Sequence, residues 1–204
     1  MVSMPELSLE LAVRLASCFF LGSIPFAVLA MKGTGVDIRK FGSGNPGFNN
    51  VLRFSKPRAV VTLVGDLGKG LLAIWLWQKP GDTIAVGWLY GLTSILGHCY
   101  SPFLKFNGGK GIATSAGVMV YLYPKLAPVS MLAYAALRLV GAKRKWLEAG
   151  TISSLSAYAL FVALLLVYEG PQPAFWGFLL LLFVAWRHKK NFQVLAGQSQ
   201  PSRG

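Results

Sequence analysis

The chain has 204 residues, of which 54% are hydrophobic and 13% charged, and its formal net charge is +13. A soluble domain carries about 25% charged residues, so this composition and a mean hydropathy of +0.52 indicate a chain that is solvated largely by lipid. The basic residues lie between long apolar runs rather than on one water-facing surface, which argues against a soluble nucleic-acid-binding protein. The cysteines, Cys18 and Cys99, lack the spacing of a disulfide framework or a zinc site.

Seven apolar stretches approach the roughly 20 residues that a membrane-spanning helix needs. In chain order they are residues 14–31, 59–77, 83–100, 112–123, 126–140, 150–168 and 174–186. The fourth, fifth and seventh stretches are short, so five or six spans with one re-entrant segment are the alternative to seven.

The basic residues indicate an orientation, because cytoplasmic loops of membrane proteins are enriched in Lys and Arg. If the N-terminus is outside and the spans alternate, nearly all cations face inward; the exceptions are Arg14, Lys79, Lys125 and, within a span, Lys69. The predicted fold class is therefore all-α, a polytopic membrane protein of about seven transmembrane helices with glycine-rich cytoplasmic loops. Residues 1–204 are expected to form a single integral membrane domain.

Three inward-facing segments are more polar than connecting loops require. In the first, residues 32–53, the run GSGNPG at positions 42–47 exposes backbone amides that can turn toward one anion as a nest. In the second, residues 98–114, the run GGKG at positions 108–111 directly precedes an apolar stretch, where phosphate binds helix amides favourably. The alternative for the first run is a flexible glycine-rich turn. The alternative for Lys110 is that it only contributes to the usual enrichment of Lys and Arg on the cytoplasmic side. Gly111 stands where a Walker A loop needs Ser or Thr.

The third segment, residues 187–191, reads RHKKN and follows the last apolar stretch. Its cations alone would be a common topology signal, but His188 and Asn191 are three apart and share a helix face. Together the three segments indicate an enzyme that acts on phosphate esters at the inner leaflet, with a lipid as substrate or product. A membrane transporter of organic phosphate is the alternative, although the polar motifs gather at one face and no repeat is visible.

Asp66 and Lys69 lie within the second apolar stretch, where ionisable groups are functional candidates. Their i, i+3 spacing favours a structural ion pair. The remaining acids and histidines form no cluster with metal-ligand spacing, so the sequence predicts neither a metal nor a cofactor. No Asp follows His98 or His188 at the five-residue distance that acyltransferases use for a general base.

The motifs GSGNPGFNNVLR, LGHCYSPFLKFNGGKGIAT and RHKKN, with GSIPFAVLA and DLGKG, resemble the bacterial acyl-phosphate-dependent glycerol-3-phosphate acyltransferases. The resemblance implies a seven-span enzyme of the bacterial inner membrane, with its active site and C-terminus cytoplasmic. It implies acyl transfer from acyl phosphate to the 1-hydroxyl of sn-glycerol 3-phosphate, giving lysophosphatidic acid and phosphate, without metal or coenzyme A thioesters. Whether a soluble acyl-phosphate-synthesising partner docks on the inner loops is left open.

The resemblance also implies roles for individual residues. The catalytic residues expected from it are Ser43, Asn45, Arg53, Lys110, His188 and Asn191. The expected substrate-binding residues are Gly42, Gly44, Asn50, His98, Gly108, Gly109 and Gly111. Within these sets, Ser43, Gly44 and Asn45 match family positions around the acyl-phosphate donor. Arg53 matches the arginine that binds glycerol 3-phosphate, and Lys110 matches a phosphate-binding lysine. The donor's own phosphate is expected to take the proton of the acceptor hydroxyl.

This chain departs from the family pattern in several places. Pro46, Phe48 and Asn49 replace residues of the first motif, and Asn107 replaces a lysine before GGKG. The Ser-containing stretch that contributes an acceptor contact reads WLEAGT at residues 146–151. The residues that could take this role instead are Thr151, Ser153 and Ser154, and the sequence does not choose among them.

Overall fold

The computed structural model describes residues 8–198, and within this range the regular secondary structure is entirely helical. The all-α fold class is therefore confirmed. The chain divides into two compact units, residues 1–122 and 123–203. This division does not test the expectation that residues 1–204 form a single membrane domain, which stays a prediction.

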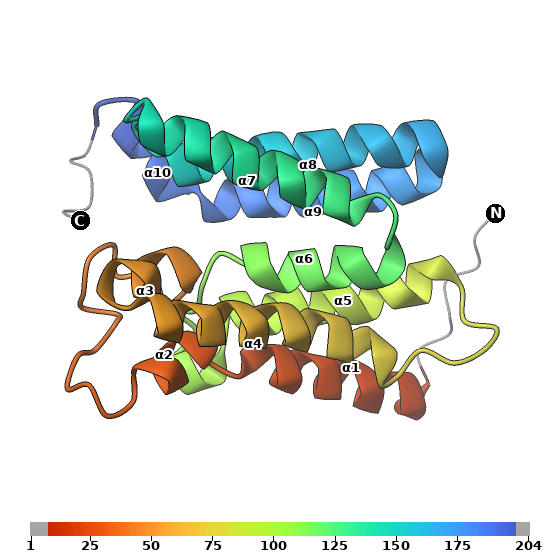
Figure 1. Ribbon diagram of the computed structural model, residues 1–204. Coiled ribbons are helices and arrows are strands. Elements are labelled where there is room, and N and C mark those ends of the chain that lie inside the picture. Colours follow the sequence, from red (N-terminus) through yellow and green to blue (C-terminus); the bar gives the residue numbers. More distant parts are fainter. Residues whose placement is uncertain (1–7, 199–204) are drawn as a thin grey trace. The chain divides into compact units, whose positions relative to one another are not determined.

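The described part of the first unit contains the helices that carry the first two motifs. In chain order they are α1 (Leu9–Ser23), α2 (Phe26–Met31), α3 (Phe48–Phe54), α4 (Lys56–Trp75), α5 (Ile84–Cys99), the 3-10 turn η1 (Pro102–Leu104) and α6 (Ile112–Leu122). The first apolar stretch is broken at Ile24–Pro25 because proline lacks an amide hydrogen and disfavours helical geometry in the preceding residue. Helices α1, α4, α5 and α6 run side by side (Figure 1).

Glycines let these helices cross with their backbones in contact. In the α1–α5 pair, a Cβ atom built on Gly22 would lie 2.0 Å from the Ser94 carbonyl oxygen, and one on Gly97 would lie 2.1 Å from the Phe19 carbonyl oxygen. The α4–α6 pair repeats this arrangement at 2.0 Å, for Gly70 on the Thr114 carbonyl and for Gly117 on the Leu67 carbonyl. Such contacts admit no side chain and are typical of helix pairs in membranes.

The described part of the second unit is built from four helices. They are α7 (Ala127–Lys143), α8 (Ala149–Tyr168), α9 (Pro171–Arg187) and the short α10 (Lys189–Leu195). Helix α8 packs against both α7 and α9. The connection from α8 to α9 turns at Gly170, whose φ of +92° is accessible to glycine at low energy.

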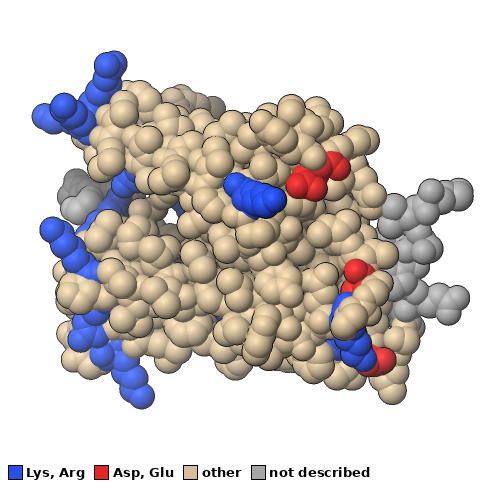
Figure 2. All heavy atoms as spheres, turned by 45° about the vertical axis from the view of Figure 1, so that its right-hand side comes forward, with Lys and Arg blue, Asp and Glu red and all other residues tan. Residues whose placement is uncertain are grey.

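The surface of the helices is apolar enough for lipid contact. On α4, Val60, Val61 and Val64 are each more than half exposed, and on α8 Val167 is 74% exposed. Figure 2 shows that most of the visible surface belongs to residues other than Lys, Arg, Asp and Glu. Large apolar side chains in contact with water would be unfavourable, so these faces fit a hydrocarbon solvent.

Two of the described helical segments, Leu9–Met31 and Ala149–Tyr168, are long and apolar enough on their own to cross a membrane. Helix α6 has 11 residues, which at about 1.5 Å per residue is short of the hydrocarbon thickness. The expected count of seven spans is therefore not established by helix length and hydropathy, and it stays a prediction.

Candidate active site

Asn50, at the start of α3, organises the first motif. Its side chain is buried, and its Nδ2 group donates to the carbonyl oxygens of Ile38 at 3.0 Å and Phe41 at 2.9 Å. Its Oδ1 atom accepts a hydrogen bond from the Ser43 amide at 3.0 Å. Asn50 was expected to bind substrate, but the structure gives it a different role because the loop backbone occupies its amide group.

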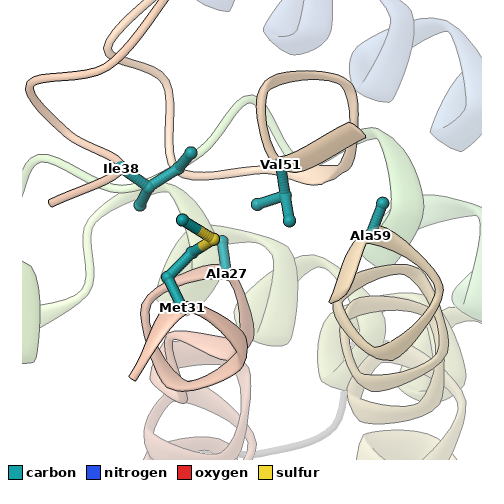
Figure 3. Close-up of a cluster of buried hydrophobic side chains, with 5 residues drawn as sticks. All are labelled: Ala27, Met31, Ile38, Val51 and Ala59. Atoms are coloured by element: carbon teal, nitrogen blue, oxygen red, sulfur yellow. The ribbon is translucent and has the colours of Figure 1, made fainter. Parts of the chain in front are cut away.

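A cluster of buried apolar side chains anchors the same loop to the helices around it. Figure 3 shows Met31 and Ala27 of α2 packed toward Ile38 of the loop, Val51 of α3 and Ala59 of α4. All five residues are less than 4% exposed. Burial of these side chains holds the loop between three helices, which positions the residues that follow it.

Arg53 of α3 lies against the glycine turn of this loop. Gly42 has a φ of +53°, and a Cβ atom there would lie 2.5 Å from Asn50 Oδ1 and 3.3 Å from Arg53 Nη1. The side chains of Arg53 and Ser43 are exposed, and that of Asn45 is half-buried. The structure therefore places Arg53 beside the turn at Gly42, and the roles expected of Gly42, Ser43 and Arg53 stay predictions.

The anion nest expected at this turn is not formed. The Ser43 amide donates to Asn50, and the Gly44 amide donates to the Phe41 carbonyl oxygen at 2.9 Å. These amides stabilise the turn itself and do not converge on a common point. An anion at this turn would have to be held by side chains, such as the Arg53 guanidinium, because amides in internal hydrogen bonds have no remaining hydrogen to donate.

The other arginines near the first motif have protein partners. Arg39 donates to the Asp37 carboxylate from Nε and from Nη2, each at 2.9 Å, and this hydrogen bonding holds the pKa of Asp37 below its usual range. Arg58 donates to the backbone carbonyl oxygens of Ala30 and Lys32. Among the arginines of this region, these contacts make Arg39 and Arg58 weaker candidates than Arg53 for binding a ligand.

The second motif folds back on the end of α5. The Gly108 amide donates to the Cys99 carbonyl oxygen at 3.1 Å and the Gly109 amide to the His98 carbonyl oxygen at 3.2 Å. The expectation that both amides are available to an anion is therefore wrong. A Cβ atom on Gly109 would lie only 2.1 Å from His98 Nε2, so the glycine allows the loop to rest directly on the histidine ring.

Lys110 and Gly111 connect this loop to α6. Lys110 is half-buried, and Gly111 takes a φ of +88°. Helix α6 begins at the next residue, Ile112. First-turn amides carry the positive end of the helix dipole, so this end of α6 together with Lys110 forms an electropositive site.

His98, the first residue of the second motif, lies beside a buried ion pair of α4. Asp66 Oδ1 is 2.8 Å from Lys69 Nζ and 3.5 Å from His98 Nδ1, and all three side chains are less than 8% exposed. Lys69 Nζ also donates to the Ile24 carbonyl oxygen at 3.0 Å. The predicted Asp66–Lys69 ion pair is confirmed. The contact with His98 was missed, because the two residues come from different helices and share no local spacing.

In the second unit, His188 stands between α9 and α10. Its ring is buried, with Nδ1 2.8 Å from the Val184 carbonyl oxygen. A carbonyl oxygen can only accept, so Nδ1 carries a hydrogen and donates it. The backbone amide of Asn191 donates to the His188 carbonyl oxygen at 2.8 Å, which keeps these two motif residues adjacent.

Glu148 is a further polar residue of this region that the sequence did not single out. Its Oε2 atom accepts from Asn191 Nδ2 at 2.5 Å and from Thr151 Oγ1 at 3.2 Å. Ser153 and Ser154 instead donate to carbonyl oxygens of their own helix, at 2.7 Å and 2.6 Å. Of the three residues that could replace the acceptor-contacting serine of the family pattern, Thr151 is thus the one that shares a hydrogen-bond partner, Glu148, with Asn191.

Within residues 8–198, no group of three or more His, Cys, Asp or Glu side chains is placed to hold a metal ion. Arg53 is exposed and Lys110 is half-buried, and the binding roles expected of both cations stay predictions. The motif residues of the first unit and those of the second, His188 and Asn191, lie in separate units.

Comparison with known proteins gives a consistent result. Residues 12–198 match the family described as glycerol-3-phosphate acyltransferase. The glycerol-3-phosphate acyltransferase of Azotobacter vinelandii is 38% identical over 87% of this chain and 91% of its own length. That of Methylobacillus flagellatus is 37% identical over 95% of this chain and 97% of its own length.

Among solved structures, the chain is similar to the crystal structure of PlsY, an integral membrane glycerol 3-phosphate acyltransferase, in its glycerol 3-phosphate form. The TM-score is 0.81 at 30% identity, and the alignment covers 94% of this chain and 95% of the other. The lysophosphatidic acid form of PlsY matches with a TM-score of 0.80.

The helical packing, the apolar exterior and the likeness to these structures define an integral membrane protein with cationic loops at its helix ends. The chain belongs to the glycerol-3-phosphate acyltransferase family.

Proposed function

We propose that this protein transfers a fatty acyl group from acyl phosphate to the 1-hydroxyl of sn-glycerol 3-phosphate, releasing lysophosphatidic acid and inorganic phosphate. The observation that carries the proposal is the family match over residues 12–198. The similar crystal structures are described as glycerol 3-phosphate and lysophosphatidic acid forms, which correspond to an acceptor and a product of this reaction. The relatives compared above are acyltransferases, and none of them supports the transporter alternative.

Two cations of the first unit are assigned to the two phosphate groups. Arg53 presents a planar guanidinium beside the 42–47 turn, and such a group can bind a phosphate through two parallel hydrogen bonds. We assign it to glycerol 3-phosphate. Lys110 and the first turn of α6 are assigned to acyl phosphate, because a lysine charge and a helix N-terminus both favour phosphate.

Neutral groups complete the proposed site. Ser43 and Asn45, on the same turn as Gly42 and Gly44, are assigned to the acyl-phosphate donor. His98, Gly108, Gly109 and Gly111 shape the loop that carries Lys110. His188 and Asn191 are assigned to the acceptor together with Thr151.

The proposed reaction needs no acyl-enzyme. The oxygen of the 1-hydroxyl bonds to the acyl carbonyl carbon, and the bond from this carbon to the phosphate oxygen breaks. The departing phosphate takes the hydroxyl proton, so no side chain has to serve as general base. The protein contributes by holding two anions close together and by stabilising negative charge in a site of low dielectric.

For the membrane we propose the topology that the cation distribution favours. The chain has seven spans in the bacterial inner membrane, its N-terminus is outside, and its C-terminus and active site are cytoplasmic. Cysteine labelling with a membrane-impermeant reagent tests this topology. A cysteine at Lys79 should be labelled from outside intact cells and one at Lys40 should not.

The reaction is tested with the detergent-purified protein, glycerol 3-phosphate and either acyl phosphate or acyl coenzyme A. We expect lysophosphatidic acid and an equal amount of phosphate from acyl phosphate, and no product from the thioester. Product from acyl coenzyme A would contradict the proposed donor, and absence of product from both donors would contradict the proposed reaction.

A further inference from the structure

The His98 ring lies between a buried carboxylate and the loop that carries Lys110. On one side, the ring nitrogen Nδ1 is 3.5 Å from Asp66 Oδ1. On the other side, a Cβ atom built on Gly109 would lie 2.1 Å from Nε2 and 2.9 Å from Cε1. His98 is 7% exposed, and interiors packed this closely leave a ring little space to move. A shift of the ring toward the loop would therefore displace the loop backbone.

The carboxylate beside the ring is itself held in place. Asp66 Oδ1 is 2.8 Å from Lys69 Nζ, and the same ammonium group donates to the Ile24 carbonyl oxygen at 3.0 Å. Asp66 and Lys69 are each 2% exposed, so water competes little for either charge. A carboxylate attracts a ring nitrogen that bears hydrogen. The contact therefore favours the orientation in which Nδ1 of His98 faces α4 and Nε2 faces the loop.

Two neighbouring glycines of the loop meet different parts of His98. The three atoms nearest to a Cβ built on Gly109 all belong to the His98 ring, and the φ of Gly109 lies outside the left-handed region. A Cβ built on Gly108 would instead lie 2.0 Å from the His98 backbone carbonyl oxygen. A side chain at position 109 is thus opposed by the ring, whereas one at position 108 is opposed by the backbone.

Lys110 directly follows Gly109, so the backbone that rests on the ring also places the lysine. A misplacement of about 1 Å in a catalytic site can cost about 100-fold in rate. Resting on the proposed function, we propose that His98 and Asp66 are positioning residues for the acyl-phosphate donor. Asp66 holds the His98 ring, the ring sets the position of the loop backbone, and the backbone places the Lys110 charge for the donor phosphate. The buried ion pair of α4 then contributes to turnover as well as to stability.

A double-variant cycle between His98 and Gly109 tests the contact of the ring with the loop. His98→Asn keeps a nitrogen donor close to the place of Nδ1 but has no atom at the place of Nε2. Gly109→Ala should lower kcat/KM for acyl phosphate about tenfold by forcing ring and loop apart, and His98→Asn should do so by removing the support. The double variant should also stay about tenfold below wild type, because the methyl group then has room. Independent effects would instead multiply to about 100-fold.

Two controls separate positioning from a general loss of structure. Gly108→Ala combined with His98→Asn should show the full product of the two single losses, because the opposing backbone carbonyl remains. In His98→Asn, the KM for glycerol 3-phosphate, which is assigned to Arg53, should stay within about twofold of wild type. Melting temperatures of all purified variants check that the protein remains folded.

Replacement of the ion pair tests the contribution of Asp66. Asp66→Leu/Lys69→Met leaves no uncompensated buried charge, and it should lower kcat/KM for acyl phosphate about threefold or more when His98 is present. Added to His98→Asn, it should cause no further loss, because Asp66 acts through the ring. If the pair replacement does not fold, the His98–Gly109 cycle decides alone.

Multiplying losses in His98→Asn/Gly109→Ala, or a further loss when the ion pair is replaced in His98→Asn, would overturn the inference. An equal rise of the KM for both substrates in His98→Asn would also contradict it, since Lys110 is assigned to the donor alone. A wild-type protein that does not use acyl phosphate would instead refute the proposed function.

Discussion

Replacing Asp66 by Asn should destabilise the first unit strongly, although the two side chains have the same shape. Lys69 is 2% exposed, and after the substitution its ammonium group would have the Ile24 carbonyl oxygen at 3.0 Å and the Phe26 ring at 5.8 Å but no carboxylate. Removal of one partner from a buried ion pair costs about 3–5 kcal/mol. For a chain of this length that loss corresponds to a fall in melting temperature on the order of 10 °C.

The Asp66→Asn/Lys69→Met double variant separates charge from packing. It leaves no uncompensated charge, so most of the lost stability should return, because neutral replacements of buried pairs are often tolerated. Thermal unfolding of detergent-purified protein, followed by tryptophan fluorescence, measures the four members of the cycle. If Asp66→Asn melts with wild type, or if the double variant melts below both single variants, the reasoning from the buried ion pair is refuted.

Other consequences concern the ligand-binding loops. Arg53→Ala and Lys110→Ala should each lower turnover about 100-fold or more, as loss of one anion-stabilising donor does. Lys105→Ala, in the same loop as Lys110, should keep turnover near wild type. Near-wild-type turnover in Arg53→Ala or Lys110→Ala would contradict the assignments. Ser43→Ala should weaken activity, and mass spectrometry of the wild-type protein during turnover should detect no acylated Ser43. The neighbouring Arg39 keeps the pKa of Asp37 low, so this carboxylate stabilises the fold above its unfolded-state pKa and ceases to do so as the pH falls through the lower folded-state value. The melting difference between wild type and Asp37→Asn should thus be constant from about pH 8 to 5 and shrink toward about pH 3; an undiminished difference at the lowest pH would speak against this.

The sequence was informative wherever the physics is local. Apolar runs located the long helices, and i, i+3 spacing identified the Asp66–Lys69 pair, because neighbours on one helix are set by its pitch. Glycine-rich composition also located the two loops. The proline at position 25 could have been used to divide the first apolar stretch into α1 and α2, since its effect on the backbone is equally local.

The parts that could not be predicted depend on tertiary packing. The Gly108 and Gly109 amides look available in the sequence, but α5 ends beside them and its carbonyl oxygens accept their hydrogens. Asn50 lies among motif residues, yet only the folded loop shows that it serves the backbone. Glu148 belongs to a stretch that departs from the family pattern, and this departure was the one available signal for its contact with Asn191.

The backbone contacts at Gly22, Gly97, Gly70 and Gly117 also limit the path of a fatty acyl chain. At 2.0–2.1 Å from a hypothetical Cβ atom, the α1–α5 and α4–α6 crossings have no room for a methyl group, let alone a methylene chain. Hydrocarbon therefore cannot enter between the helices of either pair at these levels. A lipid tail held by this unit therefore has to avoid these crossings, so residues away from them would set any chain-length preference.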